Sequence, residues 1–355
     1  MQTEQAAPDV SIGMPVEISQ LNRELKRLWD EGGEVMTRAS LINLAVYSEA
    51  PDSLAQNTRI ISEVTKEHAC RAIVIAAHCS AAEDAAQAWI SAHCHVSRAG
   101  GKQVCSEQLS FLLEGSFSKL LPNIVFSHLD ADLPGYLWWQ GELPNPIDPQ
   151  LWTWVDRLIY DSAEWQDFNG QMQLAETARA EANHRIVLCD LNWTRLVLLR
   201  LALAQFFDHA DAQQQLARLE RIEIEFAPGY RSTAILLVGW LATQLRWKLS
   251  EPDNSSNELA FVGPAGKPIV IALSEAAGEP IGRCSLFTSR SEFRVTQPAG
   301  ADLLTLSGRR EQKELMRQLM PAGKNDPVHL LQEELMRGGP HDVYLRALAT
   351  VRTLL

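Results

Sequence analysis

Histidine and cysteine side chains gather in one stretch of the first third of the chain. His93, Cys94 and His95 follow one another, and Cys105 lies eleven residues after Cys94. Imidazole and thiolate groups are zinc ligands, and two neighbouring thiols can instead form a disulfide. On a β-strand His93 and His95 share one face and Cys94 takes the other, so the set is split. We therefore expect no metal site here.

The two cysteines come together if their segments pair as a β-hairpin. The runs 88–97 and 102–112 are extended, and Arg98-Ala99-Gly100-Gly101 between them is a hairpin signal. With Ala99-Gly100 as the turn, Cys94 lies opposite Cys105, and a slip of one residue would separate them. We expect the wider, hydrogen-bonded type of pair, where a disulfide would be strained. Cys94 and Cys105 are the redox candidates, and most other cysteines are expected as buried thiols.

Two adjacent tryptophans mark a second region. Trp138 and Trp139 lie in a short apolar run bounded by Gly and Pro, which predicts a buried strand covered on both faces. The polar end of this run, Gln140 and Glu142, would open into a cleft at the carboxyl end of the strand. Core packing alone is the other interpretation of the tryptophans.

Carboxylates also precede this strand, at Asp130 and Asp132. Paired carboxylates can carry out acid–base chemistry, but loop charges are the more frequent role for such residues. We favour the loop role.

A third group lies at an expected strand-to-helix turn. Asp190 and Arg195 flank Trp193 there. Asp190 is a candidate helix cap, and Arg195 could bind an anion or a partner, or pair with a carboxylate. The sequence leaves a structural role and a binding role equally open.

Other signals are absent from the sequence. It has no G-x-G-x-x-G, P-loop or G-x-S-x-G motif, so we expect no cofactor and find no convincing catalytic set. The net charge of −12 argues against nucleic acid and anionic membranes as partners. No apolar run of membrane-spanning length and no signal-peptide pattern occur, so we expect a cytoplasmic protein. These features slightly favour a binding or regulatory protein over an enzyme.

The periodicity predicts two domains after a loose N-terminus at 1–15. Residues 16–178 are expected to form an α/β domain, with a mixed sheet that includes the antiparallel hairpin. Residues 179–355 are expected to form an α+β domain with an antiparallel sheet and C-terminal helices, beginning with a strand at 185–189. Helices are predicted at 116–129, from Asp148 through Ile159, at 311–320 and within 328–355.

Five segments, in order, resemble the glucose-6-phosphate dehydrogenase assembly protein OpcA family. They begin at Glu67-His68-Ala69-Cys70-Arg71, leading into Ala72-Ile73-Val74-Ile75, and at Gly101-Lys102-Gln103-Val104-Cys105-Ser106-Glu107-Gln108-Leu109. They continue with Leu133-Pro134-Gly135-Tyr136-Leu137-Trp138-Trp139-Gln140-Gly141, Asp190-Leu191-Asn192-Trp193-Thr194-Arg195-Leu196 and Leu330-Leu331-Gln332-Glu333-Glu334-Leu335-Met336-Arg337. Each segment is weakly specific alone, whereas the ordered set is specific.

The resemblance implies a non-catalytic assembly factor and allosteric activator of glucose-6-phosphate dehydrogenase, in the oxidative pentose phosphate pathway that produces NADPH. It also implies redox control by thioredoxin through cysteines. The alternative is a stand-alone sugar-phosphate-binding protein or enzyme that uses the cleft beside Trp138 and Trp139. A purely structural scaffold is a third hypothesis.

Overall fold

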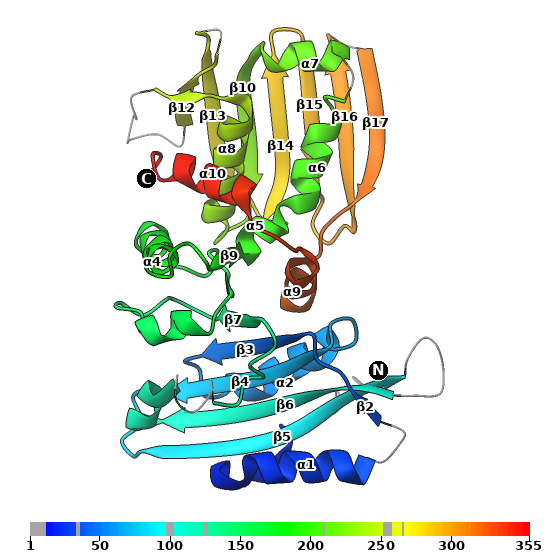
Figure 1. Ribbon diagram of the computed structural model, residues 1–355. Helices are drawn as coiled ribbons and strands as arrows, with labels where there is room; N and C mark the ends of the chain where they lie inside the picture. The colour runs from blue at the N-terminus through cyan, green and yellow to red at the C-terminus, as the bar shows by residue number, and fades with distance from the viewer. Residues whose placement is uncertain are drawn as a thin grey trace, which may run out of the picture. The chain divides into compact units, whose positions relative to one another are not determined.

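The computed structural model describes residues 12–32, 36–96, 103–121, 123, 127–208, 210–250, 258–264, 266–311 and 313–355. The chain forms two units, each built on its own sheet (Figure 1). The first unit comprises residues 1–160, 173–189 and 331–337, and the second comprises residues 161–172, 190–330 and 338–355. The loose segment expected at 1–15 and the hairpin turn at Ala99-Gly100 fall largely or wholly outside the described residues.

The first sheet is mixed, as predicted. Its strand order is β1-β5-β6-β4-β3-β7-β8-β9, and β2 pairs with β6. The strands are β1 (Met14–Val16), β2 (Met36–Arg38), β3 (Ile42–Ser48), β4 (Cys70–His78), β5 (Ala85–Val96), β6 (Gln103–Glu114), β7 (Gly135–Trp139), β8 (Arg157–Tyr160) and β9 (Val187–Asp190). The central strands β6, β4, β3, β7 and β8 run parallel, whereas β5 pairs antiparallel with β6.

Helices cover this sheet because their apolar residues repeat at helical spacing. In α2 (Ser53–Val64), Leu54, Ile60, Ile61 and Val64 are buried. The other helical segments with residues in this unit are η1 (Ile18–Gln20), α1 (Leu21–Gly32), η3 (Gly115–Leu120), η4 (Pro149–Thr153), α4 (Phe168–Glu181) and α9 (Pro327–Met336), of which α4 and α9 also contribute residues to the second unit.

The helix predicted at 116–129 is present in part: η3 is followed by helical residues at Leu121 and Asn123, whereas residues 127–129 are not helical. The helix predicted from Asp148 through Ile159 was wrong in its second half. Asp148 does cap a helical turn, accepting a hydrogen bond from the Gln150 amide, but this turn ends at Thr153. Residues 157–160 form β8 instead, because Leu158 and Ile159 pair beside β7 in the core.

The strand predicted at 185–189 exists as β9, but we were wrong to assign it to the second domain. It lies at the end of the first sheet, beyond β8. The expected boundary after residue 178 falls inside α4.

The second sheet is antiparallel apart from one pair, β10 with β13. Its order is β11-β12-β13-β10-β14-β15-β16-β17. The strands are β10 (Leu219–Phe226), β11 (Lys248–Leu249), β12 (Glu258–Val262), β13 (Pro268–Glu275), β14 (Ile281–Thr288), β15 (Ser291–Thr296), β16 (Leu303–Arg310) and β17 (Lys313–Pro321). The helix predicted at 311–320 was wrong: this segment is β17, which pairs along β16 from Arg310 opposite Lys313 to Leu303 opposite Pro321.

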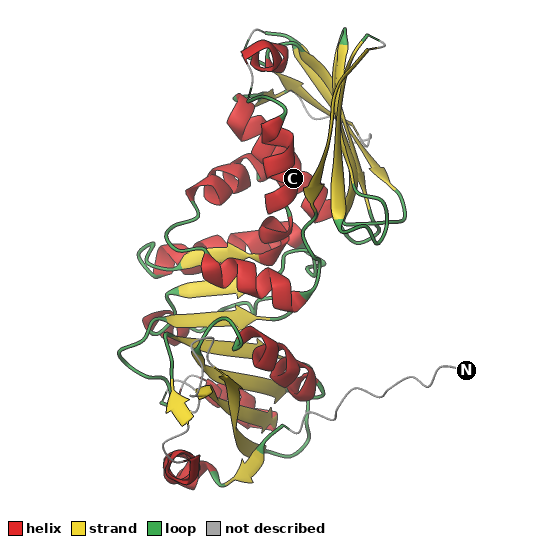
Figure 2. Ribbon diagram, turned by 90° about the vertical axis from the view of Figure 1, so that its right-hand side faces the viewer, coloured by secondary structure: helices red, strands yellow, loops and turns green. Residues whose placement is uncertain are grey.

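The helices of the second unit lie on one face of its sheet (Figure 2). They are α5 (Leu191–Arg195), α6 (Val197–Gln205), α7 (Ala210–Leu216), α8 (Arg231–Leu245) and α10 (Asp342–Val351). Burial alternates along β10: Ile222 and Ile224 are buried, whereas Glu223 and Glu225 are half-buried. Helix α8 packs closely on α10 at Gly239, where a Cβ atom would meet Val351 Cγ2 at 2.5 Å. Across the described residues, no helix is both long and apolar enough to cross a membrane.

Candidate functional site

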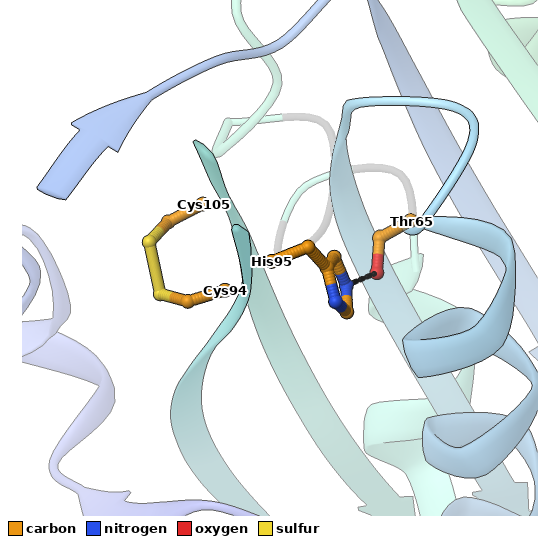
Figure 3. Close-up of a disulfide and its surroundings, with 4 residues drawn as sticks. All are labelled: Thr65, Cys94, His95 and Cys105. Carbon is orange, nitrogen blue, oxygen red and sulfur yellow. Dashed lines mark hydrogen bonds between the residues drawn. A yellow bond between two sulfur atoms is a disulfide. The ribbon is translucent and has the colours of Figure 1, made fainter. Parts of the chain in front are cut away.

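Cys94 and Cys105 form a disulfide between β5 and β6 (Figure 3). The predicted hairpin register is confirmed, because these residues are direct cross-strand partners. The S–S distance is 2.08 Å and the Cα atoms are 4.0 Å apart. The expectation of a wide, hydrogen-bonded pair was wrong, since this Cα separation belongs to the narrow type of antiparallel pair. Whether a given cross-strand pair is hydrogen-bonded depends on the geometry of the turn, which the sequence alone did not define.

The disulfide and the neighbouring histidines lie on opposite faces of the hairpin. His95 points away from the disulfide and contacts Thr65 Oγ1 at 3.4 Å (Figure 3). His93 hydrogen-bonds through Nε2 to Gln108 Oε1 at 2.8 Å. The alternation of the strand therefore separates imidazoles from sulfurs, as the sequence predicted. Burial lowers the pKa of both histidines, so they are predominantly neutral near pH 7.

Access to the two sulfur-bearing residues is unequal. Cys105 is fully buried, whereas Cys94 is half-buried. A thiolate that attacks this disulfide would therefore approach the Cys94 sulfur and leave Cys105 as the departing thiolate. The other four cysteines are free. Burial raises the pKa of Cys70 and Cys284 to about 12, which leaves almost no thiolate near pH 7, while Cys79 is exposed.

Trp138 and Trp139 belong to the core and do not form the open cleft that we expected. Their exposed fractions are 5% and 4%. The Trp139 ring packs on Tyr47 with centroids 4.1 Å apart, and its Nε1 donates to the Glu142 carbonyl oxygen at 2.9 Å. As successive residues of a central strand they face opposite layers, and each layer covers one ring.

The polar end of the same strand is also engaged within the protein. The side-chain amides of Gln140 and Asn57 hydrogen-bond to each other in both directions, at 2.9 and 2.8 Å. Glu142 is exposed, in the loop after β7. Gln140 therefore attaches β7 to helix α2. Before the strand, Asp130 and Asp132 shape a loop, with the Asp132 amide donating to Asp130 Oδ1 at 3.3 Å.

Asp190 caps α5 from a fully buried position in the second unit. Its carboxylate accepts hydrogen bonds from the Asn192 amide at 2.9 Å, from the Ser162 hydroxyl at 2.7 Å and from the Tyr344 hydroxyl at 3.1 Å. Burial, reinforced by the charge of Asp161, raises the pKa of Asp190 to about 7, although the bonds to Ser162 and Asn192 oppose this shift.

Arg195 pairs with a carboxylate, which was one of the two roles left open. Its guanidinium donates to both carboxylate oxygens of Asp161, at 2.7 and 3.2 Å, and lies 5.4 Å from the Tyr230 ring centroid. Trp193 is buried, and the Arg200 guanidinium lies 3.4 Å from its ring centroid. The predicted group therefore forms a polar network that holds the start of α5. Trp138 to Glu142 belong to the first unit and Asp190 to Arg195 to the second.

Comparison with known proteins places these features in a family. The profile described as the glucose-6-phosphate dehydrogenase subunit N-terminal domain matches residues 61–177, and the corresponding C-terminal domain profile matches residues 186–348. The two matches follow one another and cover most of the chain. The chain belongs to the OpcA family.

Relatives from cyanobacteria support this assignment. A Synechocystis protein named "Putative OxPP cycle protein OpcA" is 24% identical over 239 residues, which are 64% of this chain and 48% of the relative. A Nostoc punctiforme protein of the same name is 25% identical over 195 residues, 54% of this chain and 41% of the relative. The chain thus matches about half the length of these OpcA relatives. Among solved structures, a probable oxidoreductase, yhhX, matches with 10% identity and a TM-score of 0.48 over 88% of this chain and 95% of that chain.

In this OpcA-family chain Glu107 is a further candidate site residue, which was not among those singled out from the sequence. Its side chain is 1% exposed and accepts hydrogen bonds from Trp29 Nε1 at 3.0 Å and Arg38 at 2.7 Å, and Arg71 lies 3.0 Å away as an ion-pair partner. The signal was present in the sequence, because Glu107 alternates with Cys105 and Leu109 on the buried face of a predicted strand. A carboxylate at such a position requires a buried cationic partner.

Proposed function

We propose that this protein is a non-catalytic assembly factor and allosteric activator of glucose-6-phosphate dehydrogenase in the oxidative pentose phosphate pathway. The consecutive matches to both glucose-6-phosphate dehydrogenase subunit domains carry the proposal. The name of the cyanobacterial relatives supports the link to the pathway. The burial of Trp138 and Trp139 weighs against the alternative, a stand-alone enzyme or sugar-phosphate-binding protein with its cleft at those residues.

Activation by a protein partner has a defined energetic requirement. The activator must bind the active conformation of the dehydrogenase more tightly than the inactive one. A difference of about 1–3 kcal/mol between these two binding free energies shifts the equilibrium about 5- to 150-fold. No chemical step on this chain is needed.

We further propose that the Cys94–Cys105 disulfide regulates this activator. The disulfide supports the proposal because it joins one half-buried and one fully buried residue at the end of a hairpin. A reduced dithiol such as that of thioredoxin would attack the Cys94 sulfur and form a mixed disulfide. Its second thiol would then displace Cys94, which leaves two thiols on this chain and a disulfide on thioredoxin.

The test is the rate of the dehydrogenase from the same organism, measured against glucose 6-phosphate concentration with and without this protein. A lower apparent KM or a higher kcat supports the activator, and an unchanged KM and kcat in a confirmed complex would instead indicate a scaffold. No complex and no kinetic effect would reject the proposal.

The redox part needs its own variants. Each is assayed after oxidation and after reduction by thioredoxin. Cys94→Ser should abolish any difference between the two conditions. Cys79→Ser is the matched control, since Cys79 is exposed but outside the disulfide, and it should keep the wild-type difference.

A further inference from the structure

A cavity on the first unit combines cationic and apolar walls. Its volume is about 410 Å³, and it lies between helix α1 and the strands β2, β4 and β6. Lys26, Arg38 and Arg71 line it together with Leu25, Trp29 and Met36. It is separate from the Trp138–Glu142 segment, in which the sequence had suggested a cleft.

The charges that line this cavity leave a cationic excess. Glu107 and Asp30 are its acidic residues, against three basic ones. Glu107 Oε1 accepts the contacts from both Arg38 and Arg71, so one carboxylate oxygen serves two guanidinium groups. A local excess of positive charge is notable on a chain with a net charge of −12, because the overall field repels anions.

The two arginines have donors beyond those used by Glu107. Arg71 Nε is buried and has no hydrogen-bond acceptor among the described residues. Buried donors are normally satisfied by protein, water or a bound group. The Arg38 side chain, which pairs with the buried Glu107, is 43% exposed. The N–H groups that Arg38 does not use on Glu107 can therefore reach a ligand in the cavity. Guanidinium groups bind phosphate through paired N–H donors.

The apolar wall defines the rest of the ligand. Trp29 uses its only polar atom, Nε1, on Glu107, so the half-buried ring offers an apolar surface beside Leu25 and Met36. An aromatic ring of this kind packs on the C–H face of a sugar, and the cavity volume lies in the usual range for small-molecule sites.

We propose that this cavity binds a sugar phosphate, with the phosphate on Lys26, Arg38 and Arg71 and the sugar against Trp29. The proposal adds a small-molecule site to the activator function, and its test does not require the dehydrogenase. A failed test would therefore leave the activator proposal intact.

The experiment is isothermal titration calorimetry of the oxidised full chain with glucose 6-phosphate, inorganic phosphate and glucose as separate probes. Glucose 6-phosphate should bind saturably to one site and more tightly than either other probe. Absence of saturable binding would overturn the proposal. Equal affinity for inorganic phosphate and glucose 6-phosphate would overturn the assignment of the sugar to Trp29.

Variants locate the binding. Arg38→Gln leaves Glu107 paired with Arg71 and Trp29, and should weaken glucose 6-phosphate binding about ten-fold. Lys26→Gln, at an exposed helix position, should weaken it about three-fold. Lys248→Gln makes the same charge change in the second unit and should have no effect. Equal affinities in all three folded variants, verified by circular dichroism, would overturn the assignment.

Discussion

Arg38 lies directly beside Cys105 in the register of the first sheet. Strand β2 runs parallel to β6 with Arg38 opposite Cys105, and the Ala39 amide donates to the Cys105 carbonyl oxygen at 3.0 Å. Strand β2 positions Arg38 beside Glu107. This strand therefore pairs with the same end of β6 that the disulfide joins to β5. This relationship connects the two proposals, because opening the disulfide should loosen the end of the sheet on which Arg38 is placed.

We predict that reduction weakens sugar phosphate binding. The expected decrease in glucose 6-phosphate affinity is about five-fold, an ordinary coupling between two sites. By linkage, glucose 6-phosphate should make the disulfide harder to reduce by the same factor. Calorimetry on oxidised and reduced protein measures the first effect, and a dithiothreitol titration measures the second. The Cys94→Ser/Cys105→Ser variant should match the reduced protein, and equal affinity in both states would show that the disulfide and the cavity are independent.

Thiol reactivity should follow burial. Oxidised native protein should react rapidly at Cys79 alone, because the pKa of the buried thiols is raised and reagents cannot reach them. After reduction, Cys94 should become a second reactive thiol because it is half-buried. Denatured protein should show four free thiols when oxidised and all six after reduction. Ellman's reagent gives these counts, and six thiols in the oxidised, denatured protein would contradict the disulfide.

The buried carboxyl group of Asp190 should make stability fall as pH rises. The pKa of Asp190 in the folded protein is about 7, whereas an unfolded aspartate titrates near 4. The folded state therefore holds this proton more tightly. The stability associated with it is fully present below about pH 4 and is lost progressively as pH rises towards and through 7.

The size of this effect can be measured by urea unfolding. Between pH 5 and pH 8 the contribution of Asp190 to the free energy of unfolding should decrease by about 2.5 kcal/mol. In Asp190→Asn, which cannot titrate, the pH dependence should be flatter by that amount. Asp156→Asn is a comparison at another aspartate, in the first unit. A wild-type slope retained in Asp190→Asn would mean that the carboxyl group is ionised throughout this range.

Loss of the amide pair between α2 and β7 should cost stability. Gln140→Ala leaves the Asn57 side chain, which is 2% exposed, without its partner. An unsatisfied buried amide costs about 1–3 kcal/mol of unfolding free energy. Gln87→Ala, at an exposed position on β5, should change it by less than about 0.5 kcal/mol. Chemical denaturation of both variants makes the comparison, and similar values would show that water replaces Gln140 without cost.

Local patterns predicted several elements of the fold because the necessary information lies close in the sequence. The β5–β6 register follows from two extended runs and the Gly-rich connection between them, and the buried strand at Trp138 and Trp139 follows from a short apolar run bounded by Gly and Pro. The failures occurred where distant partners decided the structure. Leu158 and Ile159 read as helical after the cap at Asp148, yet they pair with β7. Residues 311–320 also read as helical, yet Lys313–Pro321 complete a sheet beside β16.

The sequence by itself determined which cysteines face each other and that His93 and His95 lie on the face opposite to Cys94, because hairpin pairing and strand alternation are local rules. It also identified the family through ordered segments. Only the tertiary structure decided that Trp138 and Trp139 fill a core, that Arg195 pairs with Asp161, and that Trp29, Arg38 and Arg71 meet at Glu107. The physical reason is that a buried charge or ring must be matched by partners from other strands and helices, and the folded chain alone determines which of them are close enough.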